Sequence, residues 1–589
     1  MPSAAELFMA AVPLIITAVL LVGLLWPATR AMPIAWVAAL LVGFFIWNNP
    51  PVWLVSASIV GVMTALTILW IVFGALVLLY TLMQAGAFDR INQGFAAVSE
   101  DRRVQIVLLA FFLATFIEGA AGFGTPAAVV APLLLALGFP ALAAVVAALI
   151  GHIIAVTYGA VGTPIIVGIE TPLNDVESIR LAIEEDGGMT VAQYATEVAA
   201  WAATYHALVG FVMPLFAVGM VVYFFGDREE RSIKPALEVW PLCLFAGIVF
   251  AIPYWASAWF LTAEFPSLIG AMIGGAITVA ALRAGYFQPD TEWDFPPREE
   301  WPTHWVGTIE PGGEEVNGPN LNGQSMSLLK AWAPYIFLVI LLVITRVSDQ
   351  ISAVINDADI GVTIGDVTLG IVIAWEDILG TGLGSSIAWV NVPGFWLIVA
   401  ALIAIPLFDM NGQQVKDAWY EAGEKLVAPF IALVFVIAMV QVMLQSGAAP
   451  GAPEFGSMIE VLAIATANVT GLAYPAIAPL IGALAAAMVG SNTVSNITFG
   501  GFQFTAAHEL DLSSQIIVGA QAVGGAIGNL VAIHNVVAAL ATVGLVGQEG
   551  RVMRLNLIPL FYYAVFVGFW VLVFVYIMPD VWPEVFDVY

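Results

Sequence analysis

One carboxylate lies where an apolar membrane helix would not be expected to hold a charge. Glu118 is part of the run FIEGAAGFGTPAA at 116–128, which also contains Gly122, Gly124 and Thr125 followed by a proline. Glycine permits a tight turn and close approach of the backbone, and proline favours a new helix beginning there. The run therefore predicts a helix that breaks inside the membrane and restarts, with Glu118 beside the break.

A second polar interruption occurs in the other half of the chain, in the run GSNTVSN at 490–496. Ser491, Asn492, Thr493 and Asn496 supply hydroxyl and amide groups there. Two half-helices that meet inside a membrane expose backbone N–H groups at the positive ends of their dipoles, which suit an anion. Paired breaks in corresponding halves are typical of transporter binding sites.

The alternative for both runs is tight helix packing, because small residues also line ordinary helix interfaces in membranes. Packing alone does not explain Glu118, Asn492 and Asn496, so we favour a binding site. The expected substrate-binding residues in the two runs are Gly122, Gly124, Thr125, Ser491, Asn492, Thr493 and Asn496.

The ionisable residues near these breaks suggest proton transfer. A charged carboxylate in hydrocarbon is costly unless a cation pairs with it, so Glu118 is a candidate for binding and releasing a proton. The alternative is a carboxyl group that only holds a neighbouring helix. His534 can carry a proton or donate to a carboxylate, although a buried histidine is more commonly structural. We expect Glu118 and His534 to serve proton coupling, and His534 with Asn535 to contact the substrate.

Other polar residues are expected to line the same cavity, namely His152, Tyr158, Thr163, Gln521 and Asn529. No metal site or cofactor is expected, because the single cysteine, Cys243, excludes a disulfide or a cysteine cluster within the chain. The sequence also lacks a phosphate-binding glycine loop and an HExxH motif. We therefore expect neither an enzyme nor a nucleic-acid partner.

The elements that must position these residues are membrane helices. Of the 589 residues, 61% are hydrophobic and only 10% are charged. Windows long enough to span a bilayer carry no ionisable side chain at 7–26, 208–225 and 556–578. The composition predicts an all-α polytopic membrane protein.

Acidic residues give the chain a net charge of −27 and crowd into the loops at 170–200, 286–327 and 348–390. Such patches could attract cations or a basic partner. We favour a solvated surface adapted to high salt, as in halophiles. Basic residues instead mark the loops expected in the cytoplasm, at 86–104, 227–235, 411–425 and 548–555. Both termini of the chain are then expected on the extracellular side of the membrane.

Two pairs of segments indicate an internal duplication. LMQAG at 82–86 resembles MLQSG at 443–447, and AALIGHIIAV at 147–156 resembles GGAIGNLVAI at 524–533. A basic loop follows the first pentapeptide, whereas the loop after its counterpart has no Lys or Arg. The halves are therefore expected to form two inverted-topology repeats, each with a broken or re-entrant hairpin segment.

The duplication suggests a division of the chain into five parts. The expected parts are N-terminal transmembrane helices at 1–60, a first transport repeat at 61–226, connecting helices with acidic loops at 227–424, a second transport repeat at 425–580 and an acidic tail at 581–589.

Several of these runs resemble the L-lactate permease family. The resemblance is carried by FIEGAAGFGTPAAVVAPLLLALGF at 116–139, AWAPYIFLVILLVITR at 331–346, GSNTVSNITFGGFQ at 490–503 and VGGAIGNLVAIHNVVAALATVG at 523–544. It implies a multi-pass plasma-membrane carrier of about 12–14 helices that takes up lactate and related short 2-hydroxy monocarboxylates, such as glycolate, with protons. The acidic loops depart from the family pattern and keep sodium coupling open.

The residue-level reasoning and the resemblance meet in one hypothesis. Glycines and helix N-termini would bind the substrate carboxylate, and the run 491–493 would bind the hydroxyl group of the substrate. Glu118 would bind the coupled proton. One alternative is a sodium-coupled carboxylate symporter with ligands near 490–496. Another is an anion channel, which would not need two broken segments. Besides the substrate and the coupling ion, the expected partner is the lipid bilayer, and the sequence does not determine the oligomeric state.

Overall fold

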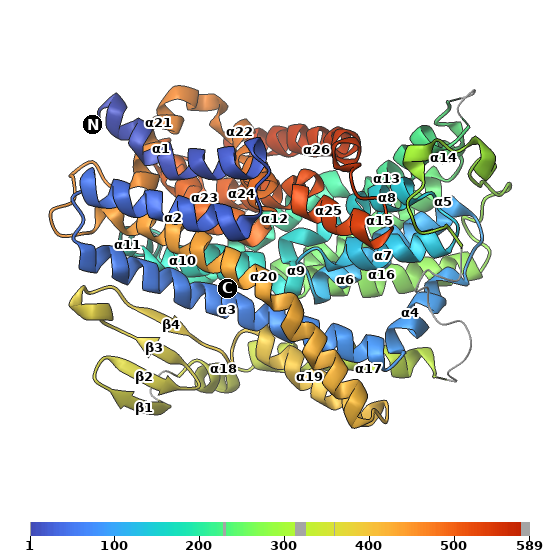
Figure 1. Ribbon diagram of the computed structural model, residues 1–589, viewed down its shortest axis with the longest axis horizontal. Coiled ribbons are helices and arrows are strands. Elements are labelled where there is room, and N and C mark those ends of the chain that lie inside the picture. The colour runs from blue at the N-terminus through green and yellow to red at the C-terminus, as the bar shows by residue number, and fades with distance from the viewer. Residues whose placement is uncertain (1, 228–230, 313–325, 358–359, 579–589) are drawn as a thin grey trace.

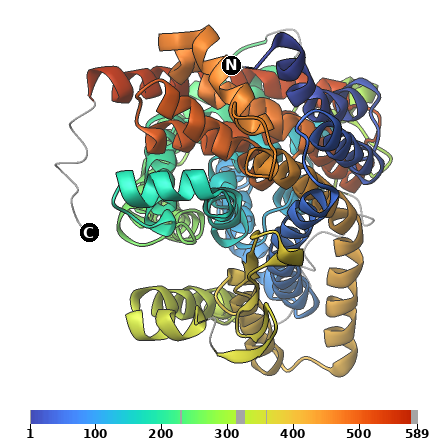
Figure 2. The same cartoon turned by 90° about the vertical axis from the view of Figure 1, so that its left-hand side faces the viewer.

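The computed structural model of the protein describes residues 2–227, 231–312, 326–357 and 360–578, so the acidic tail predicted at 581–589 lies outside the described residues. The described chain is mostly helical, and its long helices run roughly parallel in one bundle (Figures 1 and 2). Within those residues, 12 helices are long and apolar enough to cross a membrane, and one bent pair would make a thirteenth. The prediction of a helical polytopic membrane protein is confirmed.

The helices up to the middle of the chain are α1 (Ala4–Ala18), α2 (Ala28–Phe45), α3 (Pro51–Gln84), α4 (Ala87–Ala96), α5 (Arg102–Gln105), α6 (Ala114–Ala120), α7 (Thr125–Ala136), α8 (Ala141–Gly151), α9 (Gly159–Ile165), α10 (Thr171–Asp175), α11 (Glu177–Leu181), α12 (Val191–Gly210), α13 (Met213–Phe225), α14 (Lys234–Glu238), α15 (Trp240–Phe260) and α16 (Pro266–Arg283). The bent pair is α12 and α13.

The helices after that point are α17 (Leu328–Val347), α18 (Asp349–Ile355), α19 (Pro393–Leu407), α20 (Gly412–Leu444), α21 (Met458–Thr470), α22 (Tyr474–Val489), α23 (Asn492–Glu509), α24 (Ser514–Gly528), α25 (Ile533–Thr542) and α26 (Glu549–Leu572). The strands are β1 (Gly361–Ile364), β2 (Val367–Gly370), β3 (Ile373–Trp375) and β4 (Ser385–Ile387).

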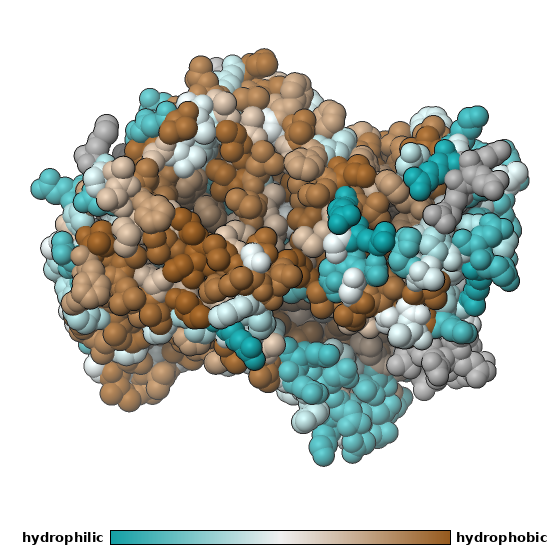
Figure 3. Space-filling view, turned by 45° about the horizontal axis from the view of Figure 1, so that its top comes forward, coloured by the Kyte–Doolittle hydropathy of each residue, from teal (hydrophilic) through white to brown (hydrophobic). Residues whose placement is uncertain are grey.

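The two ends of the bundle differ in charge. Figure 1 places α4, α5 and α14, which flank the loops rich in Lys and Arg, at its right-hand end, and α11 and the strands at its left-hand end. We call these the basic end and the acidic end. Figure 3 shows apolar side chains across the middle of one face, with hydrophilic residues gathered towards the right. Which end faces the cytoplasm stays a prediction.

The longest helices, α3 and α20, cross at very close range. A Cβ atom added at Gly61 of α3 would lie 2.5 Å from the Cα atom of Ala438 in α20. Gly74, farther along α3, approaches the carbonyl oxygen of Gly394 in α19 in the same way. Close backbone approach at small residues is how membrane helices gain packing energy. These helices therefore form a tightly packed support for the rest of the bundle.

The chain from α5 to α7 forms a re-entrant hairpin. It enters at Arg102, turns at 121–124 and returns to Gly138, where an added Cβ atom would lie 3.4 Å from Arg102 Nη2. Both ends of the hairpin are therefore at the basic end. The break predicted next to Glu118 is at the tip of this hairpin.

A second re-entrant hairpin, α22 with α23, enters from the opposite end. Asn468, in the last turn of α21 shortly before α22, donates to Glu509 at the end of α23 over 3.4 Å, so both ends of this hairpin lie together. Its tip is at Gly490 and Ser491. Hairpins from opposite ends are what the predicted inverted repeat requires, but a repeat relating 61–226 to 425–580 stays a prediction.

Each hairpin is followed by a helix that is interrupted midway. After α8 the chain passes through a 3₁₀ turn at Ile153–Tyr158, and regular helix resumes at Thr163. After α24 it passes through a shorter 3₁₀ turn at Asn529–Val531 before α25 begins. The structure therefore contains twice as many breaks as the sequence analysis identified.

A small antiparallel sheet stands at the acidic end, and the sequence analysis did not identify it. The strands follow the order β1-β2-β3-β4, with Ile364 opposite Val367 across a turn at Gly365. Gly365 has φ +61°, a conformation that glycine adopts without strain. The strands span only three or four residues each within the acidic stretch 348–390, so the alternation of apolar and polar side chains along them was too short to recognise.

The acid-rich loop at the basic end is anchored to basic residues. Arg103, which is fully buried, pairs with Asp101 over 2.7 Å and donates to the Thr291 carbonyl oxygen. Asp294 pairs with Arg102 over 2.9 Å. Opposite charges thus explain how a loop with many acids can lie at this end.

Candidate functional site

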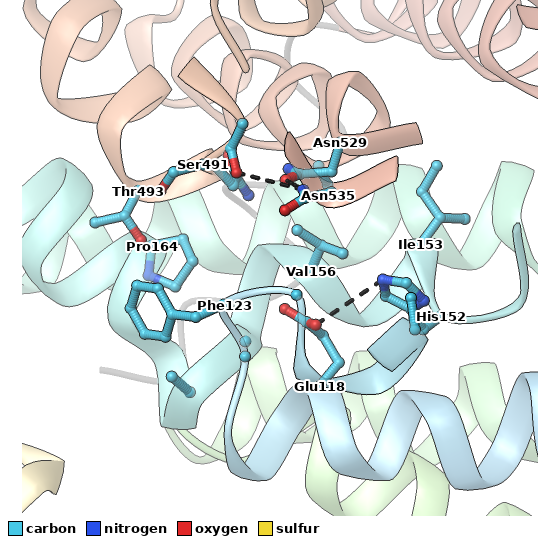
Figure 4. Close-up of a pocket in the computed structure, with 18 of the residues that line it drawn as sticks. Glu118, Phe123, His152, Ile153, Val156, Pro164, Ser491, Thr493, Asn529 and Asn535 are labelled. Carbon is cyan, nitrogen blue, oxygen red and sulfur yellow. Dashed lines mark hydrogen bonds and ion pairs between the residues drawn. The ribbon is translucent and has the colours of Figure 1, made fainter. Parts of the chain in front are cut away.

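The four chain breaks meet at one small cavity of about 50 Å³ between the two hairpins. Figure 4 shows Glu118 and His152 on one side, Ser491, Asn529 and Asn535 on the other. The first hairpin and the segment after it supply one wall, and the second hairpin with its following segment supplies the other. The fold therefore unites residues that are up to about four hundred positions apart in the sequence.

Two left-handed turns build the first wall. Gly122, Phe123 and Gly124 have φ values of +60°, +52° and +77°. Residues 160–162 repeat this conformation, with φ +43° at Ala160. A Cβ atom at Gly122 would lie 2.9 Å from the Ala160 nitrogen, so the turns pack directly against each other. Left-handed residues other than glycine carry strain, which concentrates at functional sites.

A Gly-Thr-Pro sequence starts a helix after each of these turns. The Thr125 hydroxyl donates to the Gly122 carbonyl oxygen over 2.7 Å, and the Thr163 hydroxyl donates to that of Ala160 over 2.6 Å. The break at 160–162 was missed in the sequence analysis. The repeated Gly-Thr-Pro at 124–126 and 162–164 is the signal that could have revealed it.

The second wall begins at the tip of the other hairpin. Gly490 ends α22 in a left-handed conformation, and the Ser491 side chain caps α23 by accepting from the Val494 N–H. Asn492 is 3% exposed and lines the cavity, yet neither its Oδ1 nor its Nδ2 atom has a hydrogen-bond partner. An amide left unpaired in a buried cavity costs free energy, so Asn492 is suited to bind a ligand.

Asn496 connects the two walls. Its Nδ2 atom donates to the Pro164 carbonyl oxygen over 2.9 Å, and its Oδ1 atom has no partner. Asn535 makes a second connection, because a Cβ atom at Gly124 would lie 3.1 Å from its Oδ1 atom. The Asn535 amide donates to Asn529 Oδ1 over 2.8 Å, which fixes its orientation.

Glu118 faces His152 across the first wall. The Nε2 atom of His152 lies 4.0 Å from Glu118 Oε2, and both side chains are buried. His152 Nδ1 lies 2.6 Å from the Ala148 carbonyl oxygen, which can only accept. Nδ1 therefore carries a hydrogen, and in the neutral ring the lone pair of Nε2 faces the carboxyl group. At 4.0 Å the two atoms are close to each other but beyond hydrogen-bonding distance.

A glycine makes room for this carboxyl group. A Cβ atom at Gly159 would lie 2.3 Å from Glu118 Oε1. Any larger residue at position 159 would displace the carboxyl group from the cavity.

Many of the predicted residues line this cavity, and five do not. Those that line it are Glu118, Gly122, Gly124, His152, Thr163, Ser491, Asn492, Thr493, Asn529 and Asn535. Those outside the lining are Thr125, Tyr158, Asn496, Gln521 and His534. Phe123 and Gly159 line the cavity but were not among the predicted site residues.

Some of the residues outside the lining have other partners. The Tyr158 hydroxyl donates to the Ala199 carbonyl oxygen. Gln521 donates to Ser495 Oγ over 2.9 Å and accepts from Gln503, so it joins α23 to α24. His534 is exposed and lies against Gly490. The histidine beside Glu118 is thus His152, and a coupling role for His534 stays a prediction.

The cavity offers the chemistry of a small polar ligand. The N-termini of α7 and α23, with 12 and 18 residues, both lie at its wall. In the described part of the chain, no group of three or more His, Cys, Asp or Glu side chains could hold a metal ion. Helix N-termini favour a negative charge, and the Glu118–His152 pair adds a place for a proton.

A family model and several similar sequences identify the family of this chain. A family model described as L-lactate permease matches residues 6–578. The L-lactate permease of Bacillus subtilis is 25% identical over 527 residues, covering 86% of this chain and 84% of that protein. The glycolate permease GlcA of Escherichia coli is 25% identical over 559 residues, covering 92% and 91%. The solved YdaH transporter of Alcanivorax borkumensis aligns with 14% identity and a TM-score of 0.40, covering 86% and 84%.

Proposed function

The chain belongs to the L-lactate permease family, a family of transporters, and on that premise we propose that it takes up L-lactate and related short 2-hydroxy monocarboxylates by proton symport. One observation carries the proposal. A single cavity holds two helix N-termini, the unpartnered amide of Asn492 and the Glu118–His152 pair. An anion and a proton could therefore bind within the same small volume.

The substrate carboxylate would bind between the two helix starts. The first N–H groups of a helix have no partner within it, and the dipole makes that end positive. α23 supplies them at Asn492 and Thr493, and α7 supplies the Ala127 N–H from the opposite wall, because Thr125 donates to the Gly122 carbonyl oxygen and Pro126 has no N–H. A carboxylate between them would receive hydrogen bonds from both hairpins at once. Substrate binding would then hold the two hairpin tips together.

The substrate hydroxyl would bind at the start of α23. Ser491 Oγ already accepts from Val494, so its own hydrogen remains available to a ligand. Asn492 adds a free acceptor and a free donor. A 2-hydroxy acid could satisfy both atoms, whereas an acid without the hydroxyl would leave one of them unpaired. Leaving a buried polar group unpaired is an effective way to reject an analogue.

The coupling proton would bind between Glu118 and His152. With its proton on Glu118 the pair is neutral, and with the proton on Nε2 it is an ion pair. Either form is less costly in a buried site than an isolated carboxylate. Arrival of the lactate anion beside this pair would favour retention of the proton, which is the linkage that symport requires.

The unpaired Oδ1 atoms of Asn492 and Asn496 favour sodium coupling as a second candidate. Oxygen atoms at broken membrane helices are typical ligands for a coupling sodium ion. In that case Glu118 would have a structural or gating role.

Uptake of labelled L-lactate into proteoliposomes separates these candidates. We expect uphill accumulation when only a pH gradient is imposed, and its loss when a protonophore is added. Accumulation driven only by a sodium gradient at fixed pH would instead favour the second candidate. If lactate never accumulates above its external concentration under either gradient, the protein is a passive pore.

Replacing Glu118 with Gln tests the coupling residue. Gln keeps the shape of the side chain but cannot release a proton, so pH-driven accumulation should fall at least tenfold. Exchange of internal for external lactate, which needs no net proton movement, should persist. Accumulation at the native rate in this variant would exclude Glu118 from coupling.

A further inference from the structure

A second cavity, lined by side chains of a different chemical type from those of the first, opens at the basic end. Its volume is about 220 Å³, and its walls come from five separate segments of the chain. Arg551 and Arg554 project from the first turns of α26, and Arg231 lies just before α14. His304 and Trp305 come from the loop that follows α16. None of these residues takes part in the transport site.

The cavity gathers positive charge in a strongly acidic protein. The whole chain has only 16 Lys and Arg residues against 43 Asp and Glu, yet three arginines line this one hollow. All three are exposed, and none has a side-chain hydrogen bond or ion pair with another described residue. The carboxylate nearest to Arg551 in the sequence, Glu549, accepts from the Gly547 N–H over 2.9 Å. Among the residues that the structure describes, no side chain therefore competes with an anion for these three guanidinium groups.

We propose that this cavity binds a phosphate group. Three arginines carry more charge than a monocarboxylate such as lactate can balance, whereas a phosphate carries up to two negative charges near neutral pH. Guanidinium groups also match phosphate oxygens with paired hydrogen bonds. The N-terminus of α26, a helix of 24 residues, adds its dipole to the same site.

The position of the cavity gives phosphate binding a consequence for the transport hairpins. Leu142, near the start of α8, forms part of the wall. The loop that carries Trp305 continues to Thr308, whose N–H donates to the Gly544 carbonyl oxygen just after α25. The same loop reaches α7, where the Gly312 N–H donates to the Leu135 carbonyl oxygen. A bound phosphate would therefore hold this loop, and with it the C-terminal ends of α7 and α25, against α26.

The phosphate group could belong to a soluble anion or to a lipid headgroup, and the experiment has one arm for each. The full-length protein is purified in detergent, and its unfolding temperature is measured with inorganic phosphate against chloride at equal ionic strength. It is then placed in nanodiscs of phosphatidylcholine with or without phosphatidic acid. The variants are R551Q/R554Q, R231Q and the charge-preserving R551K/R554K. The matched control is R30Q, an exposed arginine in the first turn of α2.

Phosphate in one of the two arms should raise the unfolding temperature by on the order of 2 °C at saturation. The native protein, R30Q and in part R551K/R554K should respond, and R551Q/R554Q and R231Q should not. A response only to inorganic phosphate identifies a soluble ligand, and a response only to phosphatidic acid identifies a lipid. The proposal is overturned if neither arm responds, if the glutamine variants respond like R30Q, or if lactate protects through the same arginines as strongly as phosphate.

Discussion

At the scale of single residues, the cavity separates groups that hold the fold from groups that are free to bind. Asn535 and Asn529 bond to each other, and Ser491 caps a helix. Asn492 does neither, although it is buried against Gly525, where an added Cβ atom would lie 1.9 Å from its Oδ1 atom. Asn492 lowers the stability of the fold without making a hydrogen bond, so binding of a ligand best explains its presence.

Asn492→Ala should therefore weaken transport without weakening the fold. Removing an amide that has no partner should leave the unfolding temperature unchanged or slightly higher, because no hydrogen bond is lost. The lactate concentration for half-maximal uptake should rise at least tenfold, equivalent to about 1.4 kcal/mol of binding free energy.

The control for Asn492→Ala is Asn556→Ala. Asn556 is equally buried but donates to the Leu530 carbonyl oxygen over 2.9 Å. Its loss should destabilise the protein by about 1–3 kcal/mol and leave lactate affinity unaltered. Native affinity in Asn492→Ala would remove that residue from the site.

At the scale of elements, the two Gly-Thr-Pro sequences that begin helices also stabilise the strained left-handed turns before them. Each threonine hydroxyl satisfies the carbonyl oxygen three residues earlier, at the first residue of a left-handed turn. Ala160 and Val161 are not residues that adopt this conformation on their own, at a cost of about 1–2 kcal/mol each. The turns persist because they pack against each other and because the hydroxyl bonds close them.

Thr163→Val tests this role, since valine has the same shape without the hydroxyl. We expect destabilisation of about 1–3 kcal/mol, because the Ala160 carbonyl oxygen is left unpaired in a buried site. The rate of transport should fall together with the stability, because the turn forms part of the cavity wall. Thr163→Ser keeps the hydroxyl and should restore most of both properties. Equal behaviour of the valine and serine variants, in unfolding temperature and uptake, would contradict this role.

At the scale of the whole molecule, buried ion pairs and surface charge act in opposite ways. The side chains of Arg103 and Asp101 are at most 1% exposed, and Arg103 also binds Glu238 over 2.9 Å. In the neighbouring pair, Arg102 with Asp294, the Asp294 side chain is largely exposed to solvent. Breaking a buried pair leaves an uncompensated charge, whereas an exposed pair contributes little.

Arg103→Ala should therefore destabilise the protein far more than Arg102→Ala does. We expect about 3–5 kcal/mol for the first variant and about 0–1 kcal/mol for the second. Unfolding temperature and the amount of folded protein in the membrane measure the difference. Similar losses in both variants would show that the buried cluster does not anchor the loop at 286–297.

The net charge of −27 predicts a response to salt. Raising the salt concentration from about 0.1 M to about 1 M shortens the screening length from about 10 Å to about 3 Å and weakens repulsion among the acidic loops. The unfolding temperature should rise over this range. A neutral osmolyte at matched osmolarity is the control, and a flat or falling profile in salt would exclude adaptation of this surface to a saline habitat.

The sequence by itself determined the class of protein and the position of two breaks. Hydropathy is a local property, so long apolar runs predict membrane helices without any knowledge of their neighbours. Glycine and proline are also local signals, and they predicted the breaks after Glu118 and at Gly490. The resemblance then predicted the family, which the comparisons confirmed over residues 6–578.

Only the tertiary structure decided which residues meet. Ala160 and Val161 do not favour left-handed backbone, so the third break depends on packing against Gly122, and its local sign in the sequence is the Gly-Thr-Pro that follows at 162–164. The choice of His152 over His534 as the neighbour of Glu118 depends on where α8 ends. Two hairpins entering from opposite ends bring 118–124 to 490–496, because backbone freed from helix within a membrane must be satisfied by protein or by a cavity.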